Sequence, residues 1–244
     1  MFRKLYVLLA SLKEVIKTIP AIWKVKKMKE ESNERKNIIR KSIQECSGRI
    51  MTITGSKIHV KGIENIPTNQ NVLYVANHSS MFDITLLYSI LPNPLVGFVA
   101  KMSLKFYPII SGWIKATKGV FLNRGRSKKA MKQAIKTMEK EVNLLKQGHS
   151  MVVFADGTRK TEEKDFKSGS LKPAQKTNVP IVPVAITGTE QIFKESVKRP
   201  IIHITFLSPR YISRKDNINE VTKEIQNDVY EEKEKHKILI KKDS

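Results

Sequence analysis

A heptad at residues 77–83, Asn-His-Ser-Ser-Met-Phe-Asp, holds a pair of side chains that could do acid-base chemistry, His78 and Asp83. The apolar run 72–76 precedes it directly, so His78 stands where a strand ends, and strand ends in α/β sheets are where sites are built. Five residues of continuous helix would rotate Asp83 roughly 140° away from His78, so a contact requires a turn between them, which the two serines can supply. Asp83 would then accept from one imidazole nitrogen and leave the other as a general base for a hydroxyl proton.

The aspartate also has a purely structural interpretation. Ser80 and Asp83 form the Ser-x-x-Asp pattern of a helix capping box, which explains the aspartate without any chemistry. The two interpretations are compatible, because one carboxylate can cap a helix and orient a neighbouring ring.

Arg124 and Arg159 each follow a short β-type run. A guanidinium fork is the side chain best matched to a phosphate, so both are candidates for binding an anionic group. Just before Arg159, Gly157 permits a tight turn with close backbone approach, and Thr158 can add a hydroxyl donor. Alternatively, Asp156 and Gly157 form an ordinary turn between two elements.

Together these segments resemble a known family. The heptad resembles the His-x4-Asp motif of the glycerolipid acyltransferases, and its Asn-His-x-Ser-x-x-Asp form is similar to the lysophosphatidic acid acyltransferase branch. Three later segments resemble the family's second, third and fourth motifs: Gly119-Val120-Phe121-Leu122-Asn123-Arg124, Phe154-Ala155-Asp156-Gly157-Thr158-Arg159 and Val179-Pro180-Ile181-Val182-Pro183-Val184. Four motifs in the right order make the resemblance specific over about residues 55–190.

The resemblance implies that His78, oriented by Asp83, takes the proton from the sn-2 hydroxyl of 1-acylglycerol-3-phosphate as that oxygen attacks the thioester of acyl-CoA or acyl-carrier protein. Arg124 and Arg159 would hold the phosphate of this lysophosphatidic acid. The implied substrate-binding set is Asn77, Ser80, Lys101, Gly119, Phe121, Arg124, Asp156, Gly157, Thr158, Arg159, Val179 and Pro180. Other lysophospholipids, other hydroxylated lipids and glycerol-3-phosphate remain alternative acceptors.

Two parts of this set carry further alternatives. The third motif has Ala155 and Asp156 where the family usually has proline and glutamate, which affects the acceptor preference more than the reaction class. Val179 and Pro180 would shape the acyl pocket or hold the framework of the site, and core packing explains them equally well. Lys101 is a possible phosphate contact or a solvated lysine.

Short β-type runs alternate with helical segments, which predicts an α/β domain with a mixed central sheet flanked by helices. The expected strands are residues 49–54, 57–61, 72–76, 95–100, 119–122, 151–154, 181–186 and 201–207. A helix is expected over 127–147, with Met131, Ile135, Met138, Val142 and Leu145 on one face and Gly148 as its terminator. A charged helix over 217–236 and a basic tail over 237–244 complete the expected order.

Residues 1–28 carry apolar side chains at helical spacing with lysines between them, and Pro20 divides them into two helical pieces. The pattern is typical of an amphipathic helix in the membrane interface, and a helix packed on the core is the alternative. Charged residues interrupt the apolar stretch, so we expect no spanning helix. We predict a membrane-association segment and connector at 1–45, an acyltransferase domain at 46–244, and a peripheral or monotopic position on the cytoplasmic face of the membrane.

The net charge of +22, from 45 Lys and Arg against 23 Asp and Glu, indicates an anionic partner, for which a phospholipid membrane surface fits best. A generally lysine-rich surface is the alternative. Aromatic residues make up only 7% and no nucleic-acid motif stands among the lysines, so we do not expect nucleic acid as a partner. A non-catalytic basic binding protein is the rival from a different class.

We expect no cofactor and no metal, because Walker, Gly-x-Gly-x-x-Gly and ligand-cluster patterns are missing from the sequence. The single Cys46 allows no intrachain disulfide.

Overall fold

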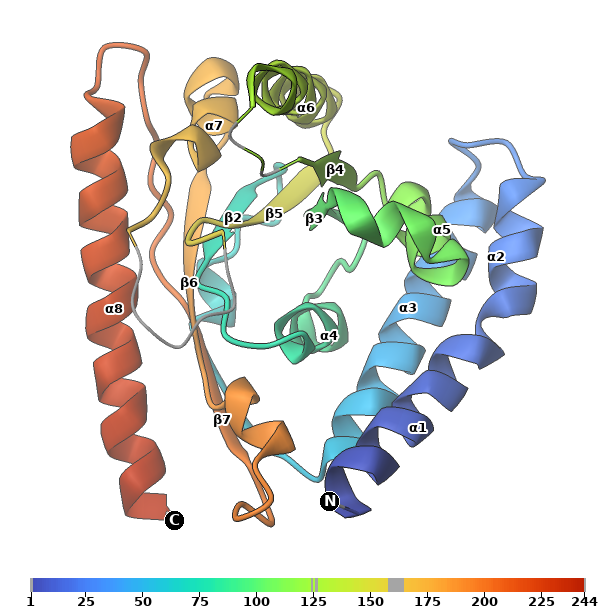
Figure 1. Ribbon diagram of the computed structural model, residues 1–244. Helices are drawn as coiled ribbons and strands as arrows, with labels where there is room; N and C mark the ends of the chain where they lie inside the picture. Colours follow the sequence, from blue (N-terminus) through green and yellow to red (C-terminus); the bar gives the residue numbers. More distant parts are fainter. Residues whose placement is uncertain (1, 124, 126, 158–164, 244) are drawn as a thin grey trace.

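A central sheet carries helices on both faces in the computed structural model, which describes residues 2–123, 125, 127–157 and 165–243 (Figure 1). The strands in this part of the chain are β1 (Lys57–Lys61), β2 (Leu73–Ala76), β3 (Val96–Lys101), β4 (Val120–Leu122), β5 (Ser150–Phe154), β6 (Ile181–Thr187) and β7 (Ile201–Phe206). Their order is β1-β7-β6-β2-β5-β3-β4. All neighbouring pairs are parallel except β6 with β7, which is antiparallel, so the predicted mixed sheet is confirmed.

Eight α-helices surround the sheet within the described ranges: α1 (Phe2–Lys17), α2 (Ile19–Lys26), α3 (Asn33–Thr54), α4 (Phe82–Ile90), α5 (Pro108–Ala116), α6 (Lys128–Lys146), α7 (Lys172–Thr177) and α8 (Ile218–Asp243). Short 3-10 turns lie at η1 (Ile63–Asn65), η2 (Met102–Phe106), η3 (Ser168–Ser170) and η4 (Thr189–Phe193). Helices α3 and α4 pack on one face of the sheet, and α6, α7 and α8 pack on the other. Strands covered on both faces explain why β2 and β6 are largely continuous apolar runs rather than alternating ones.

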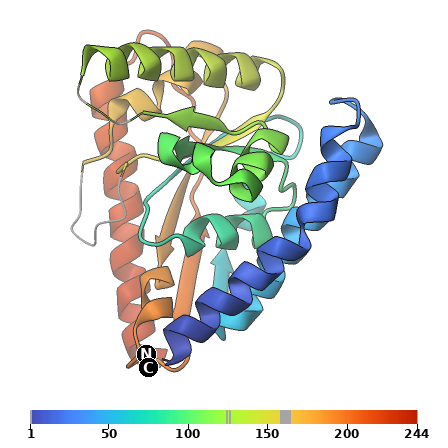
Figure 2. The same cartoon turned by 45° about the vertical axis from the view of Figure 1, so that its right-hand side comes forward.

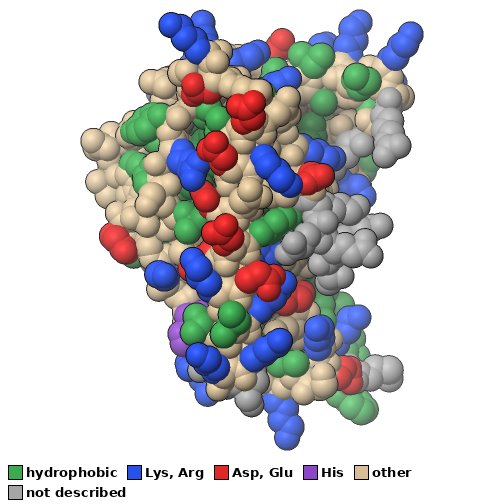
Figure 3. All heavy atoms as spheres, turned by 90° about the vertical axis from the view of Figure 1, so that its left-hand side faces the viewer, with side chains coloured by type: hydrophobic (Ala, Val, Ile, Leu, Met, Phe, Trp, Pro, Cys, Tyr) green, Lys and Arg blue, Asp and Glu red, His purple; other side chains and the backbone are tan. Residues whose placement is uncertain are grey.

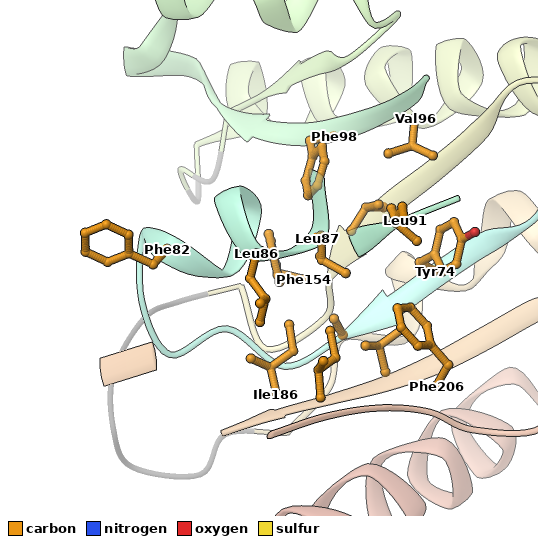
Figure 4. Packing of buried hydrophobic residues seen from close by; sticks show 14 of the residues in the cluster. Tyr74, Phe82, Leu86, Leu87, Leu91, Val96, Phe98, Phe154, Ile186 and Phe206 are labelled. Carbon is orange, nitrogen blue, oxygen red and sulfur yellow. The ribbon is translucent and has the colours of Figure 1, made fainter. Parts of the chain in front are cut away.

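The larger core cluster joins α3 and α4 to the sheet. Figure 4 shows Leu86 and Leu87 of α4 reaching toward Phe98 and Phe154 on the neighbouring strands. At the far end of this cluster, the rings of Tyr74 and Phe206 meet edge to face with their centroids 6.3 Å apart. Because this packing fixes α4 against the sheet, it also fixes the loop that leads into α4.

The prediction of a strand at residues 49–54 is wrong. Helix α3 runs without a break to Thr54, from the Ser32 cap, whose hydroxyl accepts from the Arg35 amide, to Gly55 in the left-handed region at φ 67°. Ile50 and Met51 are buried in the same cluster as α4, so tertiary packing overrides their preference for a strand. The boundary expected near residue 45 therefore falls inside one helix, and the division into 1–45 and 46–244 stays a prediction.

Two further expectations about helices change. Helix α8 continues to Asp243, so residues 237–243 are helix rather than a basic tail, and Ile240 is buried there. Figure 3 looks onto the side of the molecule that α8 covers, where acidic and basic side chains intermingle. On α6, Val142 and Leu145 are buried as expected, but Met131 and Ile135 on the same stripe are 61% and 53% exposed.

Helices α1 and α2 lie along the outside of α3 (Figure 2), and the two helical pieces predicted around Pro20 are present: the break falls at Thr18, and Pro20 lies in the first turn of α2. Val7 and Glu14 of α1 are buried, and Glu14 accepts a 2.6 Å hydrogen bond from Arg49 of α3. The opposite side of these helices exposes large apolar side chains: Phe2, Leu5, Tyr6, Leu8, Leu9, Leu12, Ile16 and Trp23. None of the helices in the described ranges combines the length and hydrophobicity that crossing a membrane requires.

Candidate active site

Polar side chains collect at the edge of the sheet where parallel strands end. Strands β6, β2, β5, β3 and β4 run in the same direction, so the residues after their carboxyl ends meet at one edge. His78 follows β2, Asp156 follows β5 and Thr189 follows β6. This is the edge at which open α/β sheets bind their ligands.

The His78 and Asp83 side chains are in direct contact. Nδ1 of His78 lies 2.8 Å from Oδ2 of Asp83, and the same oxygen accepts from the amides of Ser79 at 2.7 Å and Ser80 at 2.9 Å. Helix α4 begins only at Phe82, so residues 77–80 form the turn that the five-residue spacing required. Because the carboxylate is an acceptor, His78 donates through Nδ1, which leaves Nε2 as the ring nitrogen able to take a proton.

Half of the expected capping box is present. The Asp83 carboxylate reaches back to the Ser80 amide, but the Ser80 hydroxyl accepts from the Phe82 amide at 3.3 Å. Asp83 therefore stabilises the turn and also hydrogen-bonds the imidazole. The structural and the chemical interpretation are compatible with the same contacts of this carboxylate.

An aromatic wall lies on one side of the imidazole. The His78 ring stacks on Phe154 with centroids 4.0 Å apart and planes 16° from parallel, and Phe98 lies 6.0 Å beyond Phe154. His78 is 7% exposed and Asp83 fully buried. The ring is thus held by Phe154 on one face and by Asp83 at Nδ1, with little freedom to leave the geometry that Asp83 imposes.

Asp156 contacts the backbone of the histidine. Its Oδ2 accepts a 2.7 Å hydrogen bond from the His78 amide, so the third motif is tied directly to the first. The next residue, Gly157, has φ 67°, and a Cβ there would lie 3.3 Å from Nζ of Lys167. The tight turn expected at Asp156 and Gly157 is present, and it brings a lysine ammonium to the edge of the site.

Asn77 is engaged within the protein. Its amide group forms two 2.8 Å hydrogen bonds with the backbone of Ile186 in β6, and its Nδ2 also donates to Ser79 Oγ at 3.3 Å. Asn77 is 1% exposed. These bonds fasten the turn of the first motif to the end of β6, a role that differs from the substrate contact suggested by the sequence.

The remaining members of the predicted substrate set are spread out. Lys101 is exposed at the end of β3, while the carbonyl of Phe121 accepts from Thr137 in α6. Gly119 lies before β4, where a Cβ would come within 2.9 Å of the Ile114 carbonyl, so close packing explains this glycine.

Val179 and Pro180 precede β6 and therefore lie at the opposite edge of the sheet from His78, which favours the framework alternative for them. Arg124, Thr158 and Arg159 lie outside the described residues. In the part of the chain that the structure describes, no group of three or more His, Cys, Asp or Glu side chains could hold a metal ion.

Comparison with known proteins places this arrangement in a family. A family model described as Acyltransferase matches residues 57–187, a segment that contains all four motifs. The chain belongs to the acyltransferase family. It is 32% identical over 158 residues to a chloroplastic 1-acyl-sn-glycerol-3-phosphate acyltransferase of Arabidopsis thaliana, covering 60% of this chain and 43% of that protein. It is 30% identical over 154 residues to the 1-acyl-sn-glycerol-3-phosphate acyltransferase of Borreliella burgdorferi, covering 62% and 60% respectively.

A solved acyltransferase structure extends the likeness to nearly the whole chain. The 1-acyl-sn-glycerophosphate (LPA) acyltransferase of Thermotoga maritima superposes with a TM-score of 0.81 at 26% identity, covering 97% of this chain and 95% of that one. The matched segments span 43% to 60% of the two curated relatives named above, so this chain matches only about half of their length.

Two features of this acyltransferase-family site were not predicted from the sequence. Thr189 donates its hydroxyl to Oδ1 of Asp83 at 2.5 Å, and no pattern in the sequence marks it. The other is an apolar cavity of about 170 Å³ between α3, α4, β3 and α5, lined by residues such as Cys46, Tyr88, Phe98 and Trp113. Burial in this cavity wall raises the pKa of the Cys46 thiol to about 11. Both features come from residues far apart in the sequence, which single-sequence patterns do not bring together.

Proposed function

We propose that this chain transfers a fatty acyl group from acyl-CoA or acyl-carrier protein to the sn-2 hydroxyl of 1-acylglycerol-3-phosphate, giving phosphatidic acid. The observation that carries the proposal is the 2.8 Å contact between His78 Nδ1 and the buried Asp83, which leaves Nε2 as the base. Family membership and the acceptor named for both relatives support it.

In the proposed reaction, Nε2 of His78 removes the proton of the sn-2 hydroxyl while that oxygen forms a bond to the thioester carbonyl carbon. The tetrahedral intermediate collapses, the carbon–sulfur bond breaks, and the imidazolium returns the proton to the departing thiolate. Asp83 stabilises the imidazolium between these steps. General base help of this kind contributes typically ~10²–10⁴ in rate.

The apolar cavity is the proposed place for an acyl chain. Phe98 lines the cavity and lies 6.0 Å from Phe154, on which His78 stacks, so an acyl chain in the cavity would have its reacting end near the imidazole. An acyl tail gains roughly 0.8 kcal/mol for each methylene that it removes from water, so the methylenes that fit into this cavity would contribute to binding.

Basic side chains at the same edge are the proposed phosphate contacts. Arg124 and Arg159 keep this role from the sequence, and Lys167, whose Nζ lies beside Gly157, and the exposed Lys101 are further candidates. A charge-assisted hydrogen bond to phosphate is about twice as strong as a neutral one, which suits a group that must be held while the hydroxyl reacts.

The test measures thiol release from palmitoyl-CoA with and without 1-acylglycerol-3-phosphate, on the wild type and on His78→Ala, with mass spectrometry of the lipid product. His149→Ala is the matched control, because His149 lies before β5 at the opposite edge of the sheet. We expect acceptor-dependent release that falls about a hundredfold or more in His78→Ala and stays near wild type in His149→Ala.

The outcomes separate the parts of the proposal. Acceptor-dependent release that survives His78→Ala would refute the base. No release with acyl-CoA, acyl-carrier protein or any other lysolipid would refute the reaction and favour a basic binding protein. Transfer to a different lysolipid only would replace the acceptor.

Membrane attachment through α1 and α2 is a separate part of the proposal. The exposed apolar stripe of α1 lies opposite its buried face, and the net charge of +22 suits an anionic leaflet, placed here on the cytoplasmic side. Replacing Leu5, Leu9 and Leu12 together by serine should weaken binding to phosphatidylglycerol liposomes by about tenfold or more, whereas Leu239→Ser on α8 should not. Unchanged liposome binding by the triple variant would refute the attachment.

A further inference from the structure

The Asp83 carboxylate is completely buried, and both of its oxygens accept hydrogen bonds. Oδ2 accepts from His78 Nδ1 and from two backbone amides, while Oδ1 accepts from the hydroxyl of Thr189 at 2.5 Å. Thr189 is itself 0% exposed and lies 106 residues further along the chain. A buried carboxylate is costly unless donors surround it, so the Thr189 hydroxyl helps to satisfy this group and to hold it still.

The main chain just before Thr189 holds this residue in place. Gly188 adopts φ 97°, and a Cβ at this position would lie 2.0 Å from the carbonyl oxygen of Ile201, so only glycine fits this turn. Two residues earlier, Ile186 is bonded twice to Asn77. The turn from β6 into η4 is therefore fixed relative to the loop that carries His78, and the threonine hydroxyl has a fixed direction.

We propose that Thr189 is a positioning residue that acts on His78 through Asp83. By holding Oδ1, its hydroxyl prevents the carboxylate from rotating about its Cβ–Cγ bond and keeps Oδ2 in line with Nδ1 of His78. It also draws negative charge toward Oδ1, so less remains on the oxygen that faces the imidazole. The expected change in rate rests on the proposed acyl transfer, whereas the expected change in the tautomer and protonation of the His78 ring does not.

The charge argument gives the proposal a direction in pH. Among the described residues, two carboxylates hydrogen-bond His78: Asp83 at the ring nitrogen Nδ1 and Asp156 at the backbone amide. Removing the Thr189 hydroxyl concentrates charge on Oδ2 of Asp83 and favours the protonated ring, so less free base is present at neutral pH. A threonine that only filled space would change the rate equally at every pH.

The experiment compares Thr189→Val, which keeps the shape and removes the donor, with Thr189→Ser, which keeps the donor. Thr187→Val is the matched control, because Thr187 is a buried threonine two residues earlier whose hydroxyl bonds His236 at 3.2 Å instead. The readouts are kcat, KM for 1-acylglycerol-3-phosphate, the pH profile of kcat/KM, and the nitrogen-15 NMR signals of the His78 ring.

We expect Thr189→Val to lower kcat about 10- to 100-fold, as loss of a hydrogen bond to a charged group does, with KM within about twofold of wild type. The acidic limb of the profile should move to higher pH, and the His78 signals should show mixed tautomers. Thr189→Ser should restore the wild-type kcat, profile and spectrum, and Thr187→Val should leave all of them unchanged.

A wild-type profile and spectrum in Thr189→Val would overturn the proposal, and so would an equal loss in Thr187→Val. If the wild type transfers no acyl group, the proposed function fails, and the His78 spectra of the same variants still decide the positioning role. Should Thr189→Val not fold, Thr189→Ala removes the donor without a new methyl group and is read in the same way.

Discussion

Glu141 is a buried carboxyl group whose effect on stability can be worked out from its surroundings. It lies on the inner face of α6, one turn after Thr137, and is 6% exposed. Burial raises the pKa of Glu141 from 4.5 to about 7. Because the folded pKa is the higher one, the unfolded chain loses its proton first, so the contribution of Glu141 to stability is fully present below pH 4.5 and is lost as the pH rises through about 7.

The size of the effect follows from the shift. Each pKa unit corresponds to about 1.4 kcal/mol, so the rise from 4.5 to about 7 predicts a loss of about 3 kcal/mol in the free energy of unfolding. Glu141→Gln removes the titration while it keeps the shape. We compare the free energy of unfolding of the variant with that of the wild type at each pH. The variant minus wild-type difference should be about 3 kcal/mol larger at pH 8 than at pH 4.5.

The assay is urea unfolding followed by circular dichroism at the two pH values. Glu139→Gln is the matched control on the same helix, because Glu139 is exposed and its replacement should change stability by no more than about 0.5 kcal/mol. The reasoning is wrong if the difference between Glu141→Gln and wild type is the same at pH 4.5 and pH 8.

Two more predictions concern the other side of the sheet and the turn after β6. Burial lowers the pKa of His236 from 6.5 to about 4, so the contribution of His236 to stability is fully present above pH 6.5 and is lost as the pH drops toward 4. At pH 4.5 the titration of His236 should lower the free energy of unfolding of the wild type by about 2 to 3 kcal/mol, and His236→Gln should not show this loss. Urea titrations in which both proteins lose the same free energy of unfolding would contradict the prediction. Gly188→Ala should cost at least about 2 kcal/mol in thermal unfolding, because its Cβ would lie 2.0 Å from the Ile201 carbonyl oxygen. Gly48→Ala in α3, where a Cβ would have nothing within 4 Å, should be neutral or stabilising.

Sequence patterns were sufficient where the signal is local. The apolar runs that became β2, β5 and β6 are buried on both faces of the sheet, so each stands out as a continuous hydrophobic segment. The contact between His78 and Asp83 also follows from local geometry, because a five-residue spacing with two serines leaves few ways to join them. The resemblance in four motifs added the family, which the family model confirms.

Patterns failed where distant segments decide the outcome. Residues 49–54 have the composition of a strand, but the neighbouring α4 buries Ile50 and Met51 on one side of a helix. The sequence places Met131, Val142 and Leu145 on one face of α6, but whether Met131 is covered depends on which elements lie beside it. Asn77 and Thr189 have partners more than 100 residues away along the chain, and a single sequence does not show such pairs.

The long separation between the two halves of the site also affects a chain that is still being made. Asp83 and Thr189 are 106 residues apart, and at roughly 5–20 residues per second a ribosome needs about 5 to 20 s to synthesise the stretch between them. During that interval the imidazole loop has neither the anchor on Ile186 nor the hydroxyl at Asp83. In a nascent chain, the loop that carries His78 therefore lacks these two contacts until β6 and η4 have been synthesised and have joined the sheet.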